Sequence, residues 1–351
     1  MREEQEEASA EVTEVADRVL RLQLPINMPG LRHVNCYALV DDDGVALVDP
    51  GHFTDESLKA LERRLGVAGL PVSRIHTVLI THSHGDHFGG TQWIVDHAGA
   101  RVVTHAAFHT GFEDPNHVCT DPSHDHDVDT TEQEHVVSFR GPTPWGSEGF
   151  SAPDMSLRDK VRMLRHARRL RRMRSRPPHP NKRVRDGDVL HLAGREWFVR
   201  HTPGHTVDHI CLHDPTEGVL LSGDHVLPTI TPHISGLSTT EDPLAAFFAS
   251  LEGVAELGVA RVLPAHGHPF DDLPGRVKAI IGHHEERLSH LQTISADLGW
   301  ASVVDISHEL FAQRSWGRMA ESETYAHLEH LRLLGRAEAR GEGKSLSYLV
   351  P

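Results

Sequence analysis

The sequence predicts a layered α/β fold for most of the chain. Residues 19–24, 35–40 and 45–48 have the composition and alternation of β-strands separated by polar turns. After this β-rich opening, a segment with helical periodicity at 57–65 begins an alternation of helices with short apolar strands. Such alternation is typical of sheets that are covered by helices. We therefore expect sheets and helices to pack in several layers.

A run of histidine and aspartate follows the next predicted strand. Residues 75–80 have the composition of a buried strand, residues 91–97 have helical periodicity, and residues 81–87 between them are Thr-His-Ser-His-Gly-Asp-His. The run therefore lies at the carboxyl end of a strand, where α/β enzymes commonly place their chemistry. The chain has 30 histidines, so an exposed His-rich loop is the alternative. The position after a strand favours a metal-binding loop.

The spacing within this run suits two metal ions. Alternate side chains of an extended segment point to the same side, so His82 and His84 can bind one ion. Asp86 and His87 lie beyond the turn at Gly85 and can face a second ion. Imidazole nitrogens and carboxylate oxygens are common zinc ligands.

Three later strand ends offer further ligands. His205 follows the strand-like residues 196–200, and Asp224 follows an apolar run that ends in Ser-Gly. His266 and His268 follow a third predicted strand. Together with the first run, four junctions between strand and loop each present an imidazole or a carboxylate.

With these motifs the sequence resembles the metallo-β-lactamase superfamily, whose fold is an αββα sandwich with a dinuclear metal site at one edge. The resemblance covers most of the first 272 residues. It implies seven metal ligands, which are His82, His84 and His205 for one zinc ion, Asp86, His87 and His266 for the other, and Asp224 as the bridge. It also makes Asp86 and Asp224 the expected catalytic carboxylates. Iron or manganese can take the same ligands.

Two single carboxylates refine the resemblance. Val48-Asp49-Pro50-Gly51 matches a family turn in which the aspartate orients a ligand imidazole, a role that carboxylates commonly have around metal sites. A carboxylate at Asp224, in place of cysteine, argues against the true zinc β-lactamases, which commonly have a cysteine ligand in the second site.

Length and charge limit the number of domains and the kinds of partner that we expect. At 351 residues it exceeds one average domain, so we expect a metallo-β-lactamase domain at 13–272 and a smaller domain at 273–351. Residues 1–12 are acidic and are expected to form a frayed, disordered tail. The net charge of −15 disfavours a general nucleic-acid binder.

The sequence contains no recognisable targeting or membrane-spanning segment. Its start is acidic and lacks the basic and apolar regions of a secretory signal, and no apolar run is long enough to cross a membrane. Cys36, Cys119 and Cys211 are widely spaced and form no CxxC pair, so a reduced, cytoplasmic setting is the simple expectation.

Residues 109–182 interrupt the α/β rhythm, and we expect them to be an insertion over the active site. Residues 123–127, Ser-His-Asp-His-Asp, lack a preceding strand, which favours a polar loop over a third metal site. Residues 157–176 have helical periodicity and many arginines. They form either an anion clamp for a phosphate-bearing substrate, such as coenzyme A or an RNA backbone, or a solvated face.

Residues 273–351 look like a winged helix. They contain three predicted helices and a glycine-tipped pair of strands, at 274–290, 303–311, 324–334 and 337–349. The helix that would enter a DNA groove carries Glu323 and Glu329 beside Arg332, so the attraction that dominates DNA affinity is missing. We expect no DNA binding and favour packing or homodimerisation.

This combination is similar to the lactamase-β-2-like group of hydrolases, which with its neighbours includes polyketide thioesterases and an endoribonuclease. His209 and His283 match positions near the site and are interpreted as core histidines or as partners of ligands. Ser83 and Ser222 belong to no nucleophile motif and are interpreted as loop-shaping residues.

These features predict a dinuclear zinc hydrolase in which a metal-bound hydroxide attacks a small-molecule thioester or ester. Acyl-CoA, acyl-carrier and glutathione conjugates and lactones are the substrate classes considered. A metal-dependent endoribonuclease acting on single-stranded RNA is the alternative, which the aromatic content of 5% weakens. A third, non-enzymatic hypothesis is that the winged helix binds DNA and that the metal-binding domain acts as a sensor.

Overall fold

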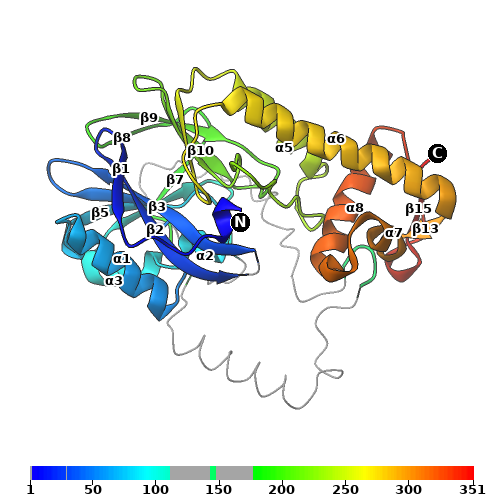
Figure 1. Cartoon of the computed structure of the whole chain (residues 1–351), viewed down its shortest axis with the longest axis horizontal. Helices are drawn as coiled ribbons and strands as arrows, with labels where there is room; N and C mark the ends of the chain where they lie inside the picture. Colours follow the sequence, from blue (N-terminus) through cyan, green and yellow to red (C-terminus); the bar gives the residue numbers. More distant parts are fainter. Residues whose placement is uncertain (1, 29, 111–142, 148–176) are drawn as a thin grey trace, which may run out of the picture.

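The computed structural model describes residues 2–28, 30–110, 143–147 and 177–351, and Figure 1 shows them as two sheets with helices on both outer sides. The layered α/β fold that the sequence predicts is confirmed. A smaller helical part at the C-terminal end adjoins the layered part.

The first sheet has seven strands, paired in chain order from β1 to β7. Its antiparallel strands are β1 (Val12–Ala16), β2 (Val19–Met28), β3 (Leu31–Val40) and β4 (Val45–Val48). Its parallel strands are β5 (Ile75–Leu79), β6 (Arg101–His105) and β7 (Lys182–Val184). The sequence did not predict β1, because this edge strand is half-exposed and lacks an apolar alternation.

The second sheet has five strands in the order β12-β11-β10-β9-β8. These are β8 (Val189–Leu192), β9 (Arg195–His201), β10 (Ile210–Asp214), β11 (Val219–Gly223) and β12 (Arg261–Pro264). All pairs are antiparallel except β11 with β12, which are parallel and therefore end at the same edge.

Each sheet packs against a core on both of its faces, because successive side chains of a strand point to opposite faces. On β3, Tyr37 and Leu39 face the second sheet, while Cys36 and Ala38 face the helices on the other side. Trp197 on β9 is fully buried between the sheets, and its indole N–H donates to the Leu192 carbonyl at 3.1 Å. The period of two places one face of each strand in each core, as expected for a sandwich of sheets.

Three of the four outer helices in the described part of the chain begin at a residue whose side chain caps the helix. The four helices are α1 (Asp55–Val67), α3 (Thr91–Ala98), α5 (Pro243–Ala255) and α6 (Leu273–Leu298). The side chains of Thr54, Asp242 and Asp272 each accept a backbone N–H from the first turn of α1, α5 and α6. The helices predicted at 57–65 and 91–97 are confirmed as α1 and α3, each with bounds within two residues of the prediction.

The frayed tail predicted for residues 1–12 is wrong for the described residues 2–12. They include the 3-10 helix η1 (Glu3–Gln5), where the fully buried Glu4 accepts a hydrogen bond from Thr229 at 2.7 Å. The Glu6 carbonyl accepts from His33 Nδ1 at 3.0 Å. These partners lie far away along the chain, so local composition could not reveal them.

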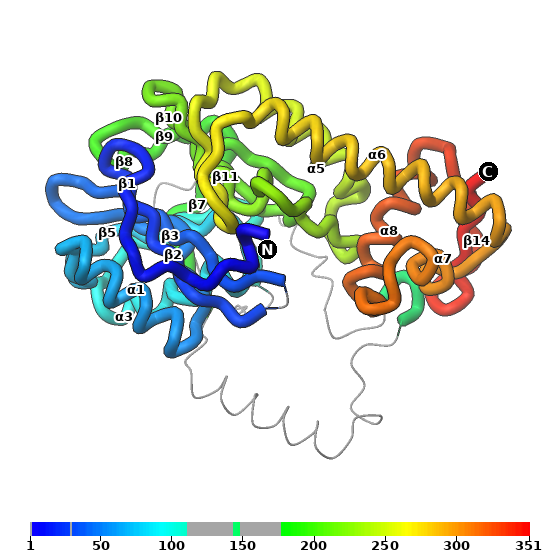
Figure 2. Tube along the Cα trace, viewed as in Figure 1, coloured from blue at the N-terminus to red at the C-terminus, as the bar shows by residue number. Residues whose placement is uncertain are grey.

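The C-terminal part begins with α6, which extends out of the layered part in Figures 1 and 2. It continues with β13 (Ala301–Ser302), α7 (Val303–Leu310), α8 (Arg318–Leu333), β14 (Glu338–Arg340) and β15 (Ser347–Leu349). Three of these segments were predicted as helices and two as strands, and β13 is additional. The strands pair in the order β13-β15-β14.

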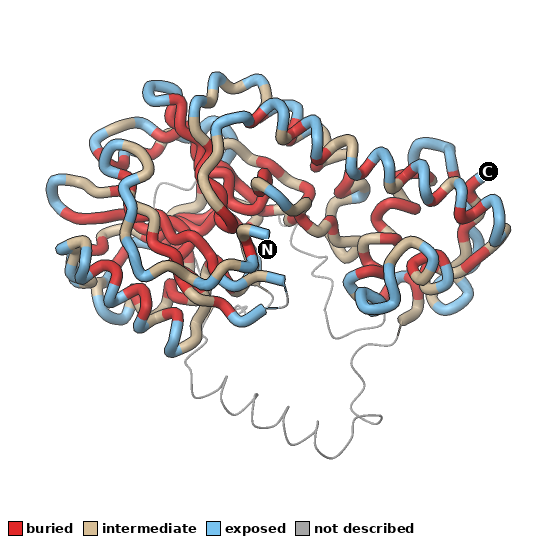
Figure 3. The backbone as a smooth tube through the Cα atoms, viewed as in Figure 1, coloured by how far each residue is buried: buried red, intermediate tan, exposed pale blue. Residues whose placement is uncertain are grey.

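One apolar cluster joins the C-terminal part to the second sheet. It runs from Val262 on β12 through Phe247 on α5 to Leu331 on α8 and Tyr348 on β15. Figure 3 shows the corresponding buried stretches along both sheets and along α6. Among the described helices, none combines the length with the apolar character that crossing a membrane requires.

Residues 143–147 are the described part of the predicted insertion. Trp145 is buried against the C-terminal part, and its indole N–H donates to Glu321 on α8 at 2.9 Å. The polar loop predicted at 123–127 and the basic helix predicted at 157–176 lie outside the described residues.

We expect Trp197→Ala to lower the free energy of unfolding by about 3–5 kcal/mol, because it leaves a cavity between the sheets. Trp316→Ala is the matched control, since Trp316 is 43% exposed. We expect it to cost about 1 kcal/mol or less. Denaturant unfolding monitored by circular dichroism measures both. Equal losses would contradict the proposed packing of Trp197.

Candidate metal centre

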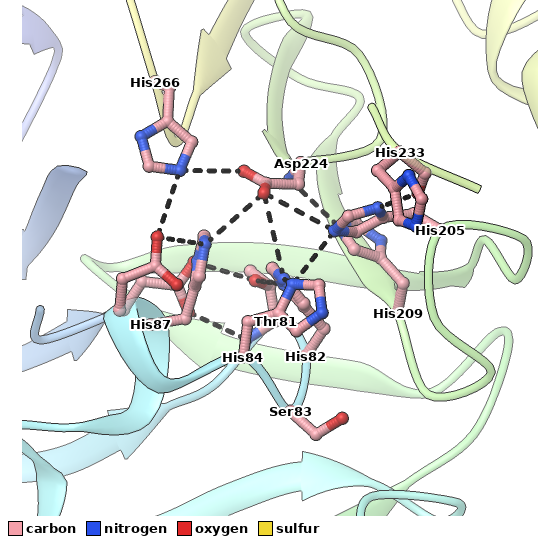
Figure 4. A network of polar contacts seen from close by, with 12 residues as sticks. Thr81, His82, Ser83, His84, His87, His205, His209, Asp224, His233 and His266 are labelled. Atoms are coloured by element: carbon pink, nitrogen blue, oxygen red, sulfur yellow. Dashed lines mark hydrogen bonds and ion pairs between the residues drawn. The ribbon is translucent and has the colours of Figure 1, made fainter. Parts of the chain in front are cut away.

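The seven residues predicted as ligands converge at one edge of the two sheets (Figure 4). His82 and His84 follow β5, while Asp86 and His87 lie in the short helix α2 (Gly85–Phe88). The other three follow the ends of β9, β11 and β12, and are His205, Asp224 and His266. The four strand ends identified from the sequence therefore meet in space.

The side chains form two adjacent groups. In the first, one donor atom from each of four residues lies within 4.8 Å of the others, and the members are His82, His84, His205 and Asp224. In the second, the same holds for three residues, Asp86, His87 and His266. These are the two sets that the spacing and the resemblance predicted, with Asp224 placed in the first.

Within the first group the inner nitrogens are close together. His84 Nδ1 lies 2.9 Å from His82 Nε2 and 3.1 Å from His205 Nε2. His82 and His205 are buried and His84 is the more accessible of the three, and loss of hydration makes a positive charge on the rings costly. Burial lowers the pKa of His84 to about 3 and, together with the nearby His87, holds that of His82 well below its usual value.

Asp224 faces both groups. Its Oδ2 lies 3.6 Å from His205 Nε2 in the first group and 3.6 Å from His87 Nε2 in the second. Its Oδ1 lies 3.4 Å from His266 Nε2. Burial opposes ionisation of Asp224, but His266 and His87 outweigh it and hold its pKa well below the usual value. An ionised carboxylate therefore lies between the two sets of imidazoles.

Three ligand imidazoles are held from outside by fixed acceptors. His87 Nδ1 lies 2.8 Å from Asp49 Oδ2, His205 Nδ1 lies 2.7 Å from the His233 carbonyl, and His266 Nδ1 lies 2.7 Å from the His33 carbonyl. Each acceptor requires a proton on Nδ1, so each Nε2 directs its lone pair inward. Sequence reasoning missed His33 and His233, because a backbone carbonyl leaves no signal in residue type.

Asp49 makes the contact with an imidazole that the resemblance predicted for it. Besides His87, its carboxylate accepts the backbone N–H of Thr81 at 2.9 Å and the Thr81 hydroxyl at 2.8 Å. The Asp49 backbone has a left-handed φ of 54°, a conformation that aspartate and asparagine tolerate better than most residues. The turn thereby fixes the start of the metal-binding loop and one of its imidazoles together.

The residues present fit two divalent cations. Among the described residues, the buried atoms His87 Nε2, His266 Nε2 and Asp224 Oδ1 have no hydrogen-bond partner. Buried polar atoms without a partner are rare because they lose their hydration without compensation. A cation bound by nitrogen and oxygen would satisfy all three atoms. The two groups can therefore hold metal ions.

The neighbouring residues have structural roles. The hydroxyl of Ser83 donates to Asp208 at 3.2 Å, and that of Ser222 donates to the Val226 carbonyl at 2.9 Å, so neither is paired with a histidine base. His209 is fully buried, and its Nε2 accepts the backbone N–H of Asp224 at 3.1 Å. His268 turns away from the centre and contacts Glu6 at 2.8 Å.

A third group was not predicted and lies between α6 and α8. It comprises His284, Glu323 and His327, whose donor atoms also lie within 4.8 Å of one another. His327 Nδ1 donates to the Glu323 carbonyl at 2.7 Å, so its Nε2 can accept the proton of His284 Nδ1 at 3.0 Å. These hydrogen bonds join the two imidazoles of the group, while the buried His284 Nε2 has no hydrogen-bond partner. The spacing of Glu323 and His327 by four residues on one helix was the available signal.

Residues 29–266 match the family described as the metallo-beta-lactamase superfamily. This match covers more than half of the chain, and the protein belongs to that superfamily. The layered fold and the clustered His and Asp side chains are those of a metallo-beta-lactamase superfamily hydrolase.

The individual relatives are fungal and bacterial. The lactamase-like protein adaB of Aspergillus niger is 26% identical over 79% of this chain and 64% of its own length, and the lactamase-like protein aptB of Emericella nidulans is 35% identical over 34% of this chain and 37% of its own length. The chain thus spans less than two thirds of these fungal relatives.

Solved structures match more of the chain. A metallo-beta-lactamase family protein from Thermus thermophilus is 29% identical with a TM-score of 0.73, covering 96% of this chain and 100% of its own. A beta-lactamase domain protein from Burkholderia ambifaria has a TM-score of 0.76 at 24% identity, covering 99% of this chain and 96% of its own, and shows the fold alone.

We expect Asp49→Asn to weaken metal binding about 10- to 100-fold, as is typical when a carboxylate that orients a ligand imidazole is lost. Asparagine tolerates the left-handed backbone, so the main changes are the loss of charge and of one of the two acceptor oxygens. Competition with a chromophoric chelator measures the affinity. Asp41→Asn, which alters the half-exposed pair of Asp41 with His76, is the control and should leave the affinity unchanged. Unchanged affinity in Asp49→Asn would show that His87 needs no orienting carboxylate.

Proposed function

We propose that this protein is a dinuclear metal-dependent hydrolase that cleaves a thioester or ester bond in a small-molecule substrate. The position of Asp224 between two groups of imidazoles carries this proposal. One carboxylate that faces both groups is the arrangement needed to hold two ions side by side. Enzyme sites that contain two metal ions commonly catalyse hydrolysis.

The proposed ligands divide into two sets. One ion would be held by His82, His84 and His205 and the other by Asp86, His87 and His266, and Asp224, which faces both groups, would be shared. Zinc is the proposed metal, because imidazole and carboxylate together are its usual ligands. Iron and manganese accept the same donors and compete for the same positions.

The ions supply the hydrolytic chemistry, since divalent metals polarise a carbonyl and make water a nucleophile near neutral pH. The residues of the chain hold the ligands in place. Asp49 and the carbonyls of His33 and His233 keep three imidazoles in the tautomer that points Nε2 inward. Asp224 and Asp86 balance the positive charge of the centre. The two serines near the ligands are occupied by other hydrogen bonds, so an acyl-serine route lacks support.

We also propose that the C-terminal part is a winged helix that packs on the hydrolase part and does not bind DNA. The order helix, strand, helix, helix, strand, strand from α6 to β15 supports this proposal. In that arrangement α8 would read DNA, yet its residues Glu321, Ser322 and Glu323 contact Trp145, Gly236 and His233 of the rest of the chain. This face of α8 is therefore engaged within the protein.

A substrate panel tests the proposed reaction. We expect acyl-CoA or another thioester to be hydrolysed, and the activity to disappear after chelation and to return with added zinc. The panel includes an acyl-CoA, S-lactoylglutathione, a homoserine lactone and a single-stranded RNA, each followed with and without chelator. Cleavage of RNA alone would replace the thioesterase proposal with that of an endoribonuclease. Turnover that resists chelation would contradict metal dependence.

Substitution of the carboxylates separates the two metal positions. We expect Asp224→Ala to abolish turnover, because it removes the shared ligand, and Asp86→Ala to reduce the bound metal toward one ion per chain. Metal content by mass spectrometry after dialysis, read beside circular dichroism, measures this. Asp208→Asn alters a buried carboxylate outside the ligand set and should retain two ions. Full activity and full metal content in Asp224→Ala would overturn the ligand assignment.

A further inference from the structure

The segment of residues 224–236, between β11 and α5, supports the metal centre twice. It begins with Asp224, and near its end the carbonyl of His233 accepts from His205 Nδ1 at 2.7 Å. Figure 4 shows His233 beside His205, on the side of that ring away from the other ligands. Movement of this segment would therefore displace a carboxylate and an imidazole of the first group.

Helix α8 of the C-terminal part contacts the same segment from outside. Glu323 Oε2 lies 3.4 Å from His233 Nδ1. The Ser322 hydroxyl accepts the backbone N–H of Gly236 at 3.0 Å. Gly236 is pressed against α8, since a Cβ there would lie 2.6 Å from the Ser322 carbonyl oxygen and 2.6 Å from Tyr325 Cδ1. The fit leaves no room for a larger residue.

Helix α6 holds the other end of the segment. The Arg276 guanidinium donates to the carbonyls of Leu227 and Ile230, both at 2.6 Å. Arg287, about three turns further along α6, forms an ion pair with Glu323. Burial would raise the pKa of Glu323, but the hydrogen bond from His233 and the charge of Arg287 lower it to about 2. Glu323 is therefore ionised and held by partners on two elements.

We propose that Glu323 is a positioning residue for the metal centre. Through His233 it fixes the carbonyl that orients His205, so the C-terminal part sets the geometry of the first metal position. This inference rests on the proposed metal-binding function. It assigns the C-terminal part a role in the hydrolase site that its resemblance to a DNA-binding fold does not indicate.

Metal affinity of designed variants tests the inference. We expect Glu323→Ala to weaken binding of the ion at the first position about 10-fold, the lower end of the range for residues that support metal ligands. Glu323→Gln keeps an acceptor for His233 Nδ1 and should restore most of the affinity. His330→Ala is the matched control. It removes another ion pair of α8, to Asp242 at 2.9 Å, which lies outside residues 224–236.

The readouts are zinc affinity by chelator competition and the melting temperature of the metal-free protein. Both variants should lower the melting temperature, since Glu323→Ala breaks the pairs with Arg287 and His233 and His330→Ala breaks the pair with Asp242. Only Glu323→Ala should lower zinc affinity. Gly236→Ala, which pushes the segment off α8 without changing a charge, should lower zinc affinity as well. If Glu323→Ala does not fold, Gly236→Ala tests the inference in its place.

Two results would overturn the inference. One is wild-type zinc affinity in both Glu323→Ala and Gly236→Ala, and the other is an equal loss in Glu323→Ala and His330→Ala. Failure of the proposed function has a different signature, because the wild-type protein itself would then bind no zinc at this centre.

Discussion

Four imidazoles and two carboxylates are buried together where the two sheets end, with the more accessible His84 ring beside them, and such buried groups are stable only if each inner donor atom finds a partner. Three of its buried atoms, His87 Nε2, His266 Nε2 and Asp224 Oδ1, have no hydrogen-bond partner, and positive charge at the centre would satisfy them. Metal ions meet this need if the lone pairs converge. The geometry of the surrounding loops follows from that requirement.

For three of the five imidazoles, convergence depends on an acceptor on the far side of the ring. A histidine ring directs Nε2 inward reliably only when Nδ1 donates to a fixed group. His266 uses a carbonyl of β3, His205 uses a carbonyl of the segment before α5, and His87 uses Asp49. Strand β3 and the segment before α5 are in turn held by parts of the chain outside the layered core.

Both ends of the chain contribute to this support. The first residues reach the site because the Glu6 carbonyl accepts from His33, whose own carbonyl holds His266. The C-terminal part reaches it because Glu323 contacts His233, whose carbonyl holds His205. Two rings in the centre are thus linked, through one residue each, to opposite ends of the sequence. The acidic residues at the start of α8 make such contacts within the protein.

The sequence by itself determined the class of fold, which His and Asp side chains gather in the two groups, and the contact of Asp49 with one of the imidazoles. Those features depend on local patterns: apolar periodicity defines strands and helices, and a run such as residues 81–87 places several ligands within one loop. Only the tertiary structure decided the edge strand β1, the packing of residues 2–12, the carbonyls of His33 and His233, and the contact of Glu323 with the site. Strand β1 is half-exposed and lacks an apolar alternation. The other features join residues distant in the chain through backbone atoms or buried charges, which leave no periodic or compositional trace in the sequence.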